Sequence, residues 1–201
     1  MAGLPGIEIY PPTASLLVTE ELRRAYERAS HPDLQETATR PLFEEFLNEF
    51  LRNRTFPLSI YGEQQVDESH RRVDIAVGFH DPSLNLIFVL LCETKRNNVR
   101  DLLELEAQMQ DYGDRYIHTS ADGDGRAVYP FVFGATAYGT KIRFYSYTRE
   151  HGIFEQSRLS ENSPLLGTSV YWDLRTDGVK IHQALMAIWN YRKQLQLMVG
   201  A

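Results

Sequence analysis

The sequence is poor in cysteine: Cys92 is the single one among 201 residues. One cysteine excludes an internal disulfide and suits a reducing compartment, so we expect an intracellular protein of the cytoplasm or nucleus. Because Cys92 lies inside an apolar stretch, we interpret it as a small core residue rather than a nucleophile or redox group.

Long hydrophobic runs are also missing. No apolar run reaches membrane-spanning length, and residues 1–17 lack the basic start and continuous apolar stretch of a signal peptide. We therefore expect no membrane partner. The net charge of −6 argues against wholesale electrostatic binding of polyanions. The length and a hydrophobic content of 43% favour one globular domain over residues 1–201.

Several catalytic patterns are absent from the sequence. There is no Walker A loop, no G-x-S-x-G elbow and no H-E-x-x-H, and the six histidines include no pair at metal-ligand spacing. The Asp-Gly-Asp-Gly run at 122–125 invites a calcium-loop interpretation, but the twelfth position of such a loop would be Phe133. We predict a turn there.

Two neighbouring segments, 71–77 and 84–95, have the pattern of β-strands, with a break at 78–83. The second is almost wholly apolar from Leu86 to Cys92, which is typical of a strand covered on both faces. Side chains alternate along a strand, so Glu93 and Lys95 share one face and Thr94 points to the other. Pairing of the two strands can bring Asp74 beside Glu93.

This combination of residue types suits a hard metal ion. Mg²⁺ prefers oxygen ligands, usually one or two carboxylates with water and substrate phosphate. Asp74 and Glu93 can supply the carboxylates, and the backbone carbonyl of Thr94 a third oxygen. Lys95 can hold or activate a water molecule, or offset negative charge that develops during reaction. The alternative is a purely structural salt bridge between Lys95 and the acids.

The segments Val73-Asp74 and Glu93-Thr94-Lys95 resemble the signature of the PD-(D/E)XK nuclease superfamily. Two further segments match patterns of that family: Glu36 to Arg40 resembles its E-x-x-T-R stretch, and Gln108 to Tyr112 resembles its Q-x-x-x-Y stretch. The resemblance covers roughly residues 33–148. Val73 replaces the proline of the family name, and Pro41, directly after Arg40, could kink the first helix.

The resemblance implies an α/β fold with a restriction-endonuclease-like core: a mixed central β-sheet flanked by helices, in the order α-βββ-α-β, plus a C-terminal helix. It implies hydrolysis of phosphodiester bonds in DNA or RNA with Mg²⁺ or Mn²⁺. The net charge does not exclude this, because a metal ion neutralises an acidic site and arginines can gather locally. The competing hypothesis is a catalytically weak or inactive module of the same fold that binds nucleic acid or a protein partner.

Roles for individual residues follow from the same resemblance. Asp74, Glu93, the Thr94 carbonyl and Glu36 would bind the metal, with Glu44 or Glu45 as the alternative helix acid. Lys95 would act on the water. Substrate contacts would come from these residues: Arg72, Arg96, Arg100, Gln108 and Tyr112. Gln108 would also count among the catalytic residues, as support for the substrate or for the attacking water. The pattern leaves the oligomeric state open, a homodimer included.

Outside these motifs, hydrophobic periodicity predicts the remaining elements. We expect an N-terminal arm and a helix capped by Thr19 within 1–32, a helix over 34–52 and a strand over 58–66. A further helix should end near Tyr112 or Tyr116, followed by strands over 127–136 and 141–148. The C-terminal part, 169–198, should form a short strand and a helix that covers the sheet.

Overall fold

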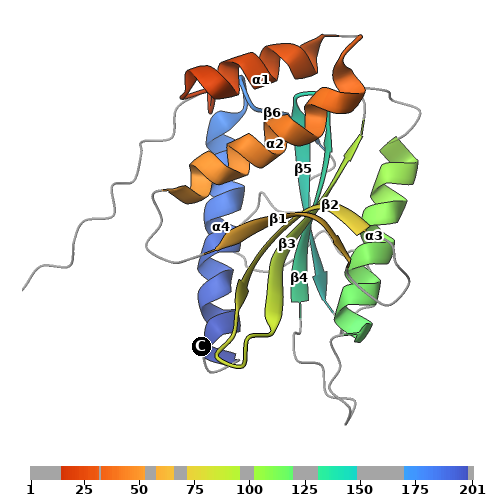
Figure 1. Cartoon of the computed structure of the whole chain (residues 1–201), viewed down its shortest axis with the longest axis vertical. Coiled ribbons are helices and arrows are strands. Elements are labelled where there is room, and N and C mark those ends of the chain that lie inside the picture. The colour runs from red at the N-terminus through yellow and green to blue at the C-terminus, as the bar shows by residue number, and fades with distance from the viewer. Residues whose placement is uncertain are drawn as a thin grey trace, which may run out of the picture.

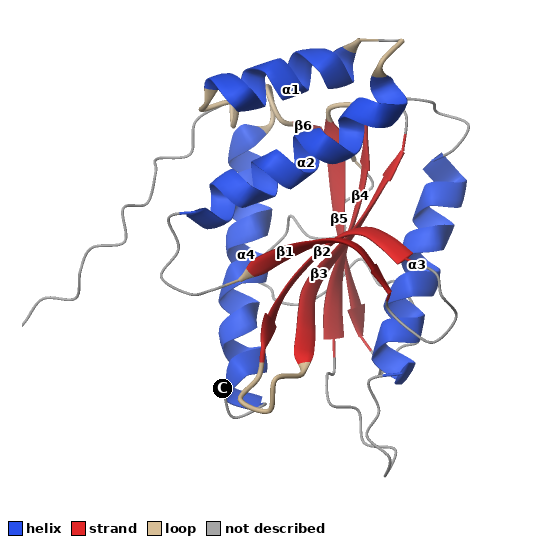
Figure 2. Cartoon of the chain, in the orientation of Figure 1, coloured by secondary structure: helices blue, strands red, loops and turns tan. Residues whose placement is uncertain are grey.

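The structure is a computed structural model that describes residues 15–31, 33–52, 58–65, 72–95, 102–119, 131–148 and 170–198. Its centre is a six-stranded mixed sheet in the order β1-β2-β3-β4-β5-β6 (Figures 1 and 2). The strands are β1 (Ser59–Gln65), β2 (Arg72–His80), β3 (Leu86–Lys95), β4 (Phe131–Tyr138), β5 (Lys141–Thr148) and β6 (Trp172–Asp173). The helices are α1 (Glu20–Ser30), α2 (Gln35–Arg52), α3 (Leu102–Thr119) and α4 (Gly178–Met198).

The sheet has the expected connectivity. The strands β1, β2 and β3 form an antiparallel meander, and β3 then pairs in parallel with β4. A parallel pair needs a crossover connection, and α3 lies between the two strands in the chain. From α2 to β4 the order is therefore α-βββ-α-β, so the core is restriction-endonuclease-like, as the sequence implied.

The helices cover both faces of the sheet (Figure 1). Tyr191 of α4 packs edge-on against Phe131 and Phe133 of β4, and α2 approaches the same face. The opposite face carries Tyr147 of β5, whose hydroxyl donates to Asp114 of α3. Covering both faces explains why all eight residues of β4 and the middle of β3 are buried.

The predicted helix over 34–52 forms without interruption and contains Pro41 in its interior. A proline inside a helix costs about 3 kcal/mol. The helix also buries Leu42 and Phe43 completely, and each such side chain contributes about 1.5–3 kcal/mol. Burial outweighs the local cost, so the helix continues through Pro41.

The break predicted at 78–83 begins too early, because β2 continues to His80. The pairing with β3 shifts by one residue between Val77 and Gly78. A side chain at Gly78 would place its Cβ 2.4 Å from the carbonyl oxygen of Ile87, so the close approach of the strands needs glycine. Glycine there marks a bulge rather than a strand end.

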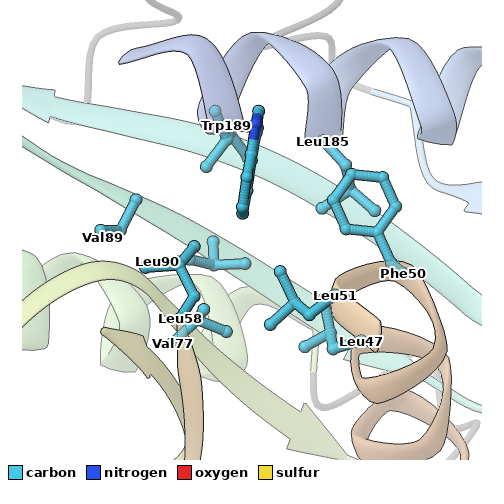
Figure 3. A pocket seen from close by; sticks show the side chains of 10 residues that line it. Leu47, Phe50, Leu51, Leu58, Val77, Val89, Leu90, Leu185 and Trp189 are labelled. Carbon is cyan, nitrogen blue, oxygen red and sulfur yellow. The ribbon is translucent and has the colours of Figure 1, made fainter. Parts of the chain in front are cut away.

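One hollow in the core lies between α2, α4 and the strands, and its lining is entirely apolar (Figure 3). Trp189 and Leu185 of α4 face Leu47, Phe50 and Leu51 of α2 across it. A water-sized sphere can move within only about 20 Å³ of this space. Ligand pockets are an order of magnitude larger and include polar groups, so this hollow is a packing defect and not a binding site.

Candidate active site

Asp74 and Glu93 lie directly opposite each other on β2 and β3. The antiparallel ladder pairs Ile75 with Cys92, and one step further along the same register brings Asp74 level with Glu93. The ladder ends at the pair of Ile75 with Cys92, and the backbone N–H of Asp74 donates to Glu93 Oε2 at 3.4 Å. The predicted juxtaposition of the two carboxylates is therefore present in the structure.

The Asp74 carboxylate is held by Thr94. Its Oδ2 accepts hydrogen bonds from the backbone N–H of Thr94 at 2.8 Å and from the Thr94 hydroxyl at 2.7 Å. The sequence assigned a role only to the carbonyl of Thr94. The Thr94 side chain meets Asp74 just beyond the last residue pair of the β2–β3 ladder. Two donors on one oxygen fix the orientation of this carboxylate.

Glu93 is a buried carboxyl group, with 5% of its surface exposed. Burial, and next the charge of Asp74, raise its pKa to about 8, against the opposing effects of the Asp74 N–H and of Lys95. Near neutral pH, Glu93 therefore holds a proton much of the time. A neighbouring cation would favour its ionised form.

Lys95 lies two residues beyond Glu93 on the same face of β3, and its positive charge lowers the pKa of Glu93, against the larger effect of burial. The row that begins with Asp74 and Glu93 continues through Thr136 of β4 to Arg143 of β5. Arg143 donates to Glu106 of α3 at 2.7 Å, which ties α3 to the sheet at the level of the two carboxylates.

Gln108 lies on the face of α3 that packs against the start of β2. The hydroxyl of Tyr112 donates to the carbonyl oxygen of Arg72 at 3.0 Å, so this face of α3 lies against the start of β2. Gln108 is one helical turn before Tyr112 on the same face. The Oε1 atom of Gln108 is buried and accepts no hydrogen bond among the described residues. An unsatisfied buried amide oxygen is costly and often marks a site for a ligand or water.

The second turn of α2 lies at the same end of the sheet as the carboxylates. Thr39 accepts a hydrogen bond from the backbone N–H of Gly139, just after Tyr138, and Tyr138 pairs with Lys95. Glu36, in the turn before, belongs to the described helix, but its side chain is outside what the structure describes. Glu44 is held by Arg40, whose Nε donates to Glu44 Oε1 at 2.8 Å. Arg96 and Arg100 lie outside the described residues.

The sequence motifs did not predict which acidic side chains bind Arg40. Besides Glu44, this arginine of the E-x-x-T-R stretch donates from Nη1 to Glu63 Oε1 of β1 at 2.8 Å. It also lies against Gly62, where an added Cβ would come within 2.6 Å of Arg40 Nη2. Glycine in an otherwise polar strand signals such a close approach, but it does not identify which arginine approaches.

The donor set at the site fits a small hard cation. Among the described side chains no group of three or more histidines, cysteines or acids could hold a metal ion. Mg²⁺ needs only one or two protein carboxylates, with water and other oxygens completing its shell. Asp74 keeps Oδ1 clear of the two bonds from Thr94, and Glu93 adds a second carboxylate. The residues present are therefore sufficient for such an ion.

Comparisons with known proteins give little further information. No protein-family model and no curated protein matches the chain. Among solved structures it is similar to the type IIG restriction endonuclease BpuSI, with a TM-score of 0.37 and 12% sequence identity over 98% of this chain. The chain spans 18% of that protein. A similarity of this strength decides nothing about activity. Of the described helices, none is both long and apolar enough to cross a membrane.

Proposed function

We propose that this chain is a divalent-metal-dependent nuclease that hydrolyses phosphodiester bonds in DNA or RNA. The observation that supports it most is the position of Asp74 beside Glu93 just beyond the last residue pair of the β2–β3 ladder, with Lys95 on the same face. Two carboxylates at the end of a buried sheet, one with its pKa raised to about 8, are unfavourable without a cation between them.

Each residue has a distinct task in this proposal. Asp74, oriented by Thr94, and Glu93 would bind Mg²⁺ or Mn²⁺ together with the carbonyl of Thr94, and Glu36 is the candidate acid from α2. When bound, the metal ion polarises the phosphoryl oxygen and lowers the pKa of a coordinated water. Lys95 would hold the attacking water and offset charge on the phosphorus centre.

Substrate contacts would come from the rim of the same site. Gln108 has an unsatisfied buried oxygen that can accept a hydrogen bond from water or from a base. The side chain of Arg72 is 61% exposed and can reach a phosphate. Tyr112 differs from these two, because its hydroxyl already donates to the carbonyl of Arg72. We assign Tyr112 to the support of the site, beside the substrate contact expected from its motif.

The direct test is cleavage of labelled single- and double-stranded DNA and RNA with Mg²⁺, with Mn²⁺ and with EDTA. Asp74→Asn removes a metal ligand with little change of shape, and Lys95→Ala removes the ammonium. We expect each to lower the cleavage rate about a hundredfold or more. Asp33→Asn and Lys180→Ala, at exposed positions elsewhere, are the matched controls. Undiminished cleavage by both site variants, or cleavage in EDTA, would rule out this site.

A second function, a binding module without efficient hydrolysis, is favoured by one observation. The described side chains supply two carboxylates and no third ligand, and one of the two has its pKa raised to about 8. Titration calorimetry with Mn²⁺ separates the alternatives. A nuclease site binds the ion, and Asp74→Asn abolishes the binding. A module that only holds nucleic acid binds labelled oligonucleotides equally well with and without the metal.

A further inference from the structure

A charged cluster lies at the edge of the sheet, on the strand next to the one that carries Asp74. Arg40 of α2 and Arg72 of β2 converge on the two oxygens of Glu63, on β1. Arg40 Nη1 is 2.8 Å from Glu63 Oε1, and Arg72 Nη1 is 3.7 Å from Glu63 Oε2. The side chain of Glu63 is 57% exposed, so the carboxylate between the two guanidinium groups faces solvent.

The backbone of Glu63 has an unusual conformation. Its φ is 50°, in the left-handed region that residues other than glycine rarely adopt. The ladder between β1 and β2 pairs Gly62 with Ile75 and Gln64 with Val73, and it omits the pair between them. Strain of this kind persists where surrounding contacts impose it, and it gathers at functional sites.

The omitted pair is Glu63 and Asp74, which places the cluster beside the proposed metal ligand. Adjacent strands lie about 4.8 Å apart, so the backbone of Glu63 lies beside that of Asp74 on the neighbouring strand. The orientation of the Arg40 side chain does not depend on Glu63 alone, because its Nε also donates to Glu44. Carboxylate and phosphate offer guanidinium groups the same pair of oxygen acceptors.

We propose that Arg40 and Arg72 form a backbone-phosphate subsite next to Asp74, and that Glu63 fills this subsite in the free protein until a nucleic-acid strand displaces it. The proposal rests on the proposed function, because the strand bound there is the strand cut at Asp74 and Glu93. Exchange is feasible because exposed ion pairs are weak. A displaced Glu63 then repels phosphate, so it lowers the affinity for nucleic acid.

The test measures binding of a short labelled duplex and of single strands by fluorescence anisotropy in EDTA, where no metal-dependent cleavage occurs. Glu63→Gln should tighten binding about two- to fivefold, the worth of an exposed ion pair. The matched control is Glu20→Gln on α1. There, Arg23 and Arg24 also share one glutamate, but within one regular helix. Both variants change the net charge equally, so only a local subsite separates them.

Arginine variants complete the test. Arg72→Gln, at a side chain 61% exposed, should weaken duplex binding and lower the slope of log K against log salt by about 0.9. Arg40→Gln should do the same, with thermal unfolding measured to confirm that α2 remains packed. In the Glu63→Gln, Arg72→Gln double variant the gain from Glu63→Gln should shrink.

Glu63→Gln that binds no better than Glu20→Gln would overturn the subsite, and so would an absence of binding in both parent and Glu63→Gln. The outcome is independent of hydrolysis. A parent that cleaves with Mg²⁺ but shows no gain in Glu63→Gln overturns only the subsite. A parent that shows the gain and never cleaves supports the subsite and overturns the nuclease.

Discussion

Glu93→Gln should change how the stability of the protein depends on pH. The folded state raises the pKa of Glu93 from 4.5 to about 8, mainly through burial and then through Asp74. Below pH 4.5 the group is protonated in both folded and unfolded chains. Between the two values only the unfolded chain releases the proton, so rising pH favours unfolding. Above about pH 8 the group is ionised in both states, and the full destabilisation is present.

The size of this effect follows from the same two values. One pKa unit corresponds to about 1.36 kcal/mol, so a rise from 4.5 to about 8 corresponds to about 5 kcal/mol at most. Glutamine has nearly the same shape and no charge. We therefore expect Glu93→Gln and the parent to have similar free energies of unfolding near pH 5, and the variant to be several kcal/mol more stable near pH 9.

Urea unfolding in EDTA, followed by circular dichroism at intervals between about pH 5 and about pH 9, measures this difference. Glu104→Gln, at an exposed position in the first turn of α3, controls for the change in net charge. If the parent and Glu93→Gln lose stability in parallel over the whole range, Glu93 is not ionising in a buried environment. The electrostatic argument for a cation at the site would then be refuted.

Two further variants test the contacts around the site. Thr94→Val keeps the shape of the side chain but removes the hydroxyl bonded to Asp74, so calorimetry should show a loss of Mn²⁺ affinity of about 10- to 100-fold. Thr94→Ser should retain the affinity, and a valine variant that binds like the parent would contradict the role of the hydroxyl. Arg143→Met leaves Glu106 partly buried without its cation, and we expect the free energy of unfolding to fall by about 3 kcal/mol in urea titrations. Adding Glu106→Gln should restore part of that loss, and a double variant no more stable than Arg143→Met would show that the pair contributes little.

The sequence predicted well wherever one strand or helix carries the information. Alternation along β3 correctly placed Glu93 and Lys95 on one face, because side-chain direction has a period of two in any strand. Helical spacing also located α2 and α3. The strand prediction failed at Gly78, which we interpreted as the end of a strand. The local signal of a glycine is the same for a turn and for a bulge, and only the approach of Ile87 decides between them.

By itself, the sequence determined the order of elements, the buried middle strands and the presence of acids and a lysine where those strands end. These properties depend on residue type and spacing along the chain. Tertiary structure alone decided that the Thr94 hydroxyl holds Asp74, and that Arg40, Glu63 and Arg72 meet. The reason is physical: the point where strand pairing ends, a left-handed residue and an approaching helix result from packing between distant segments, and no local pattern encodes the distance at which they meet.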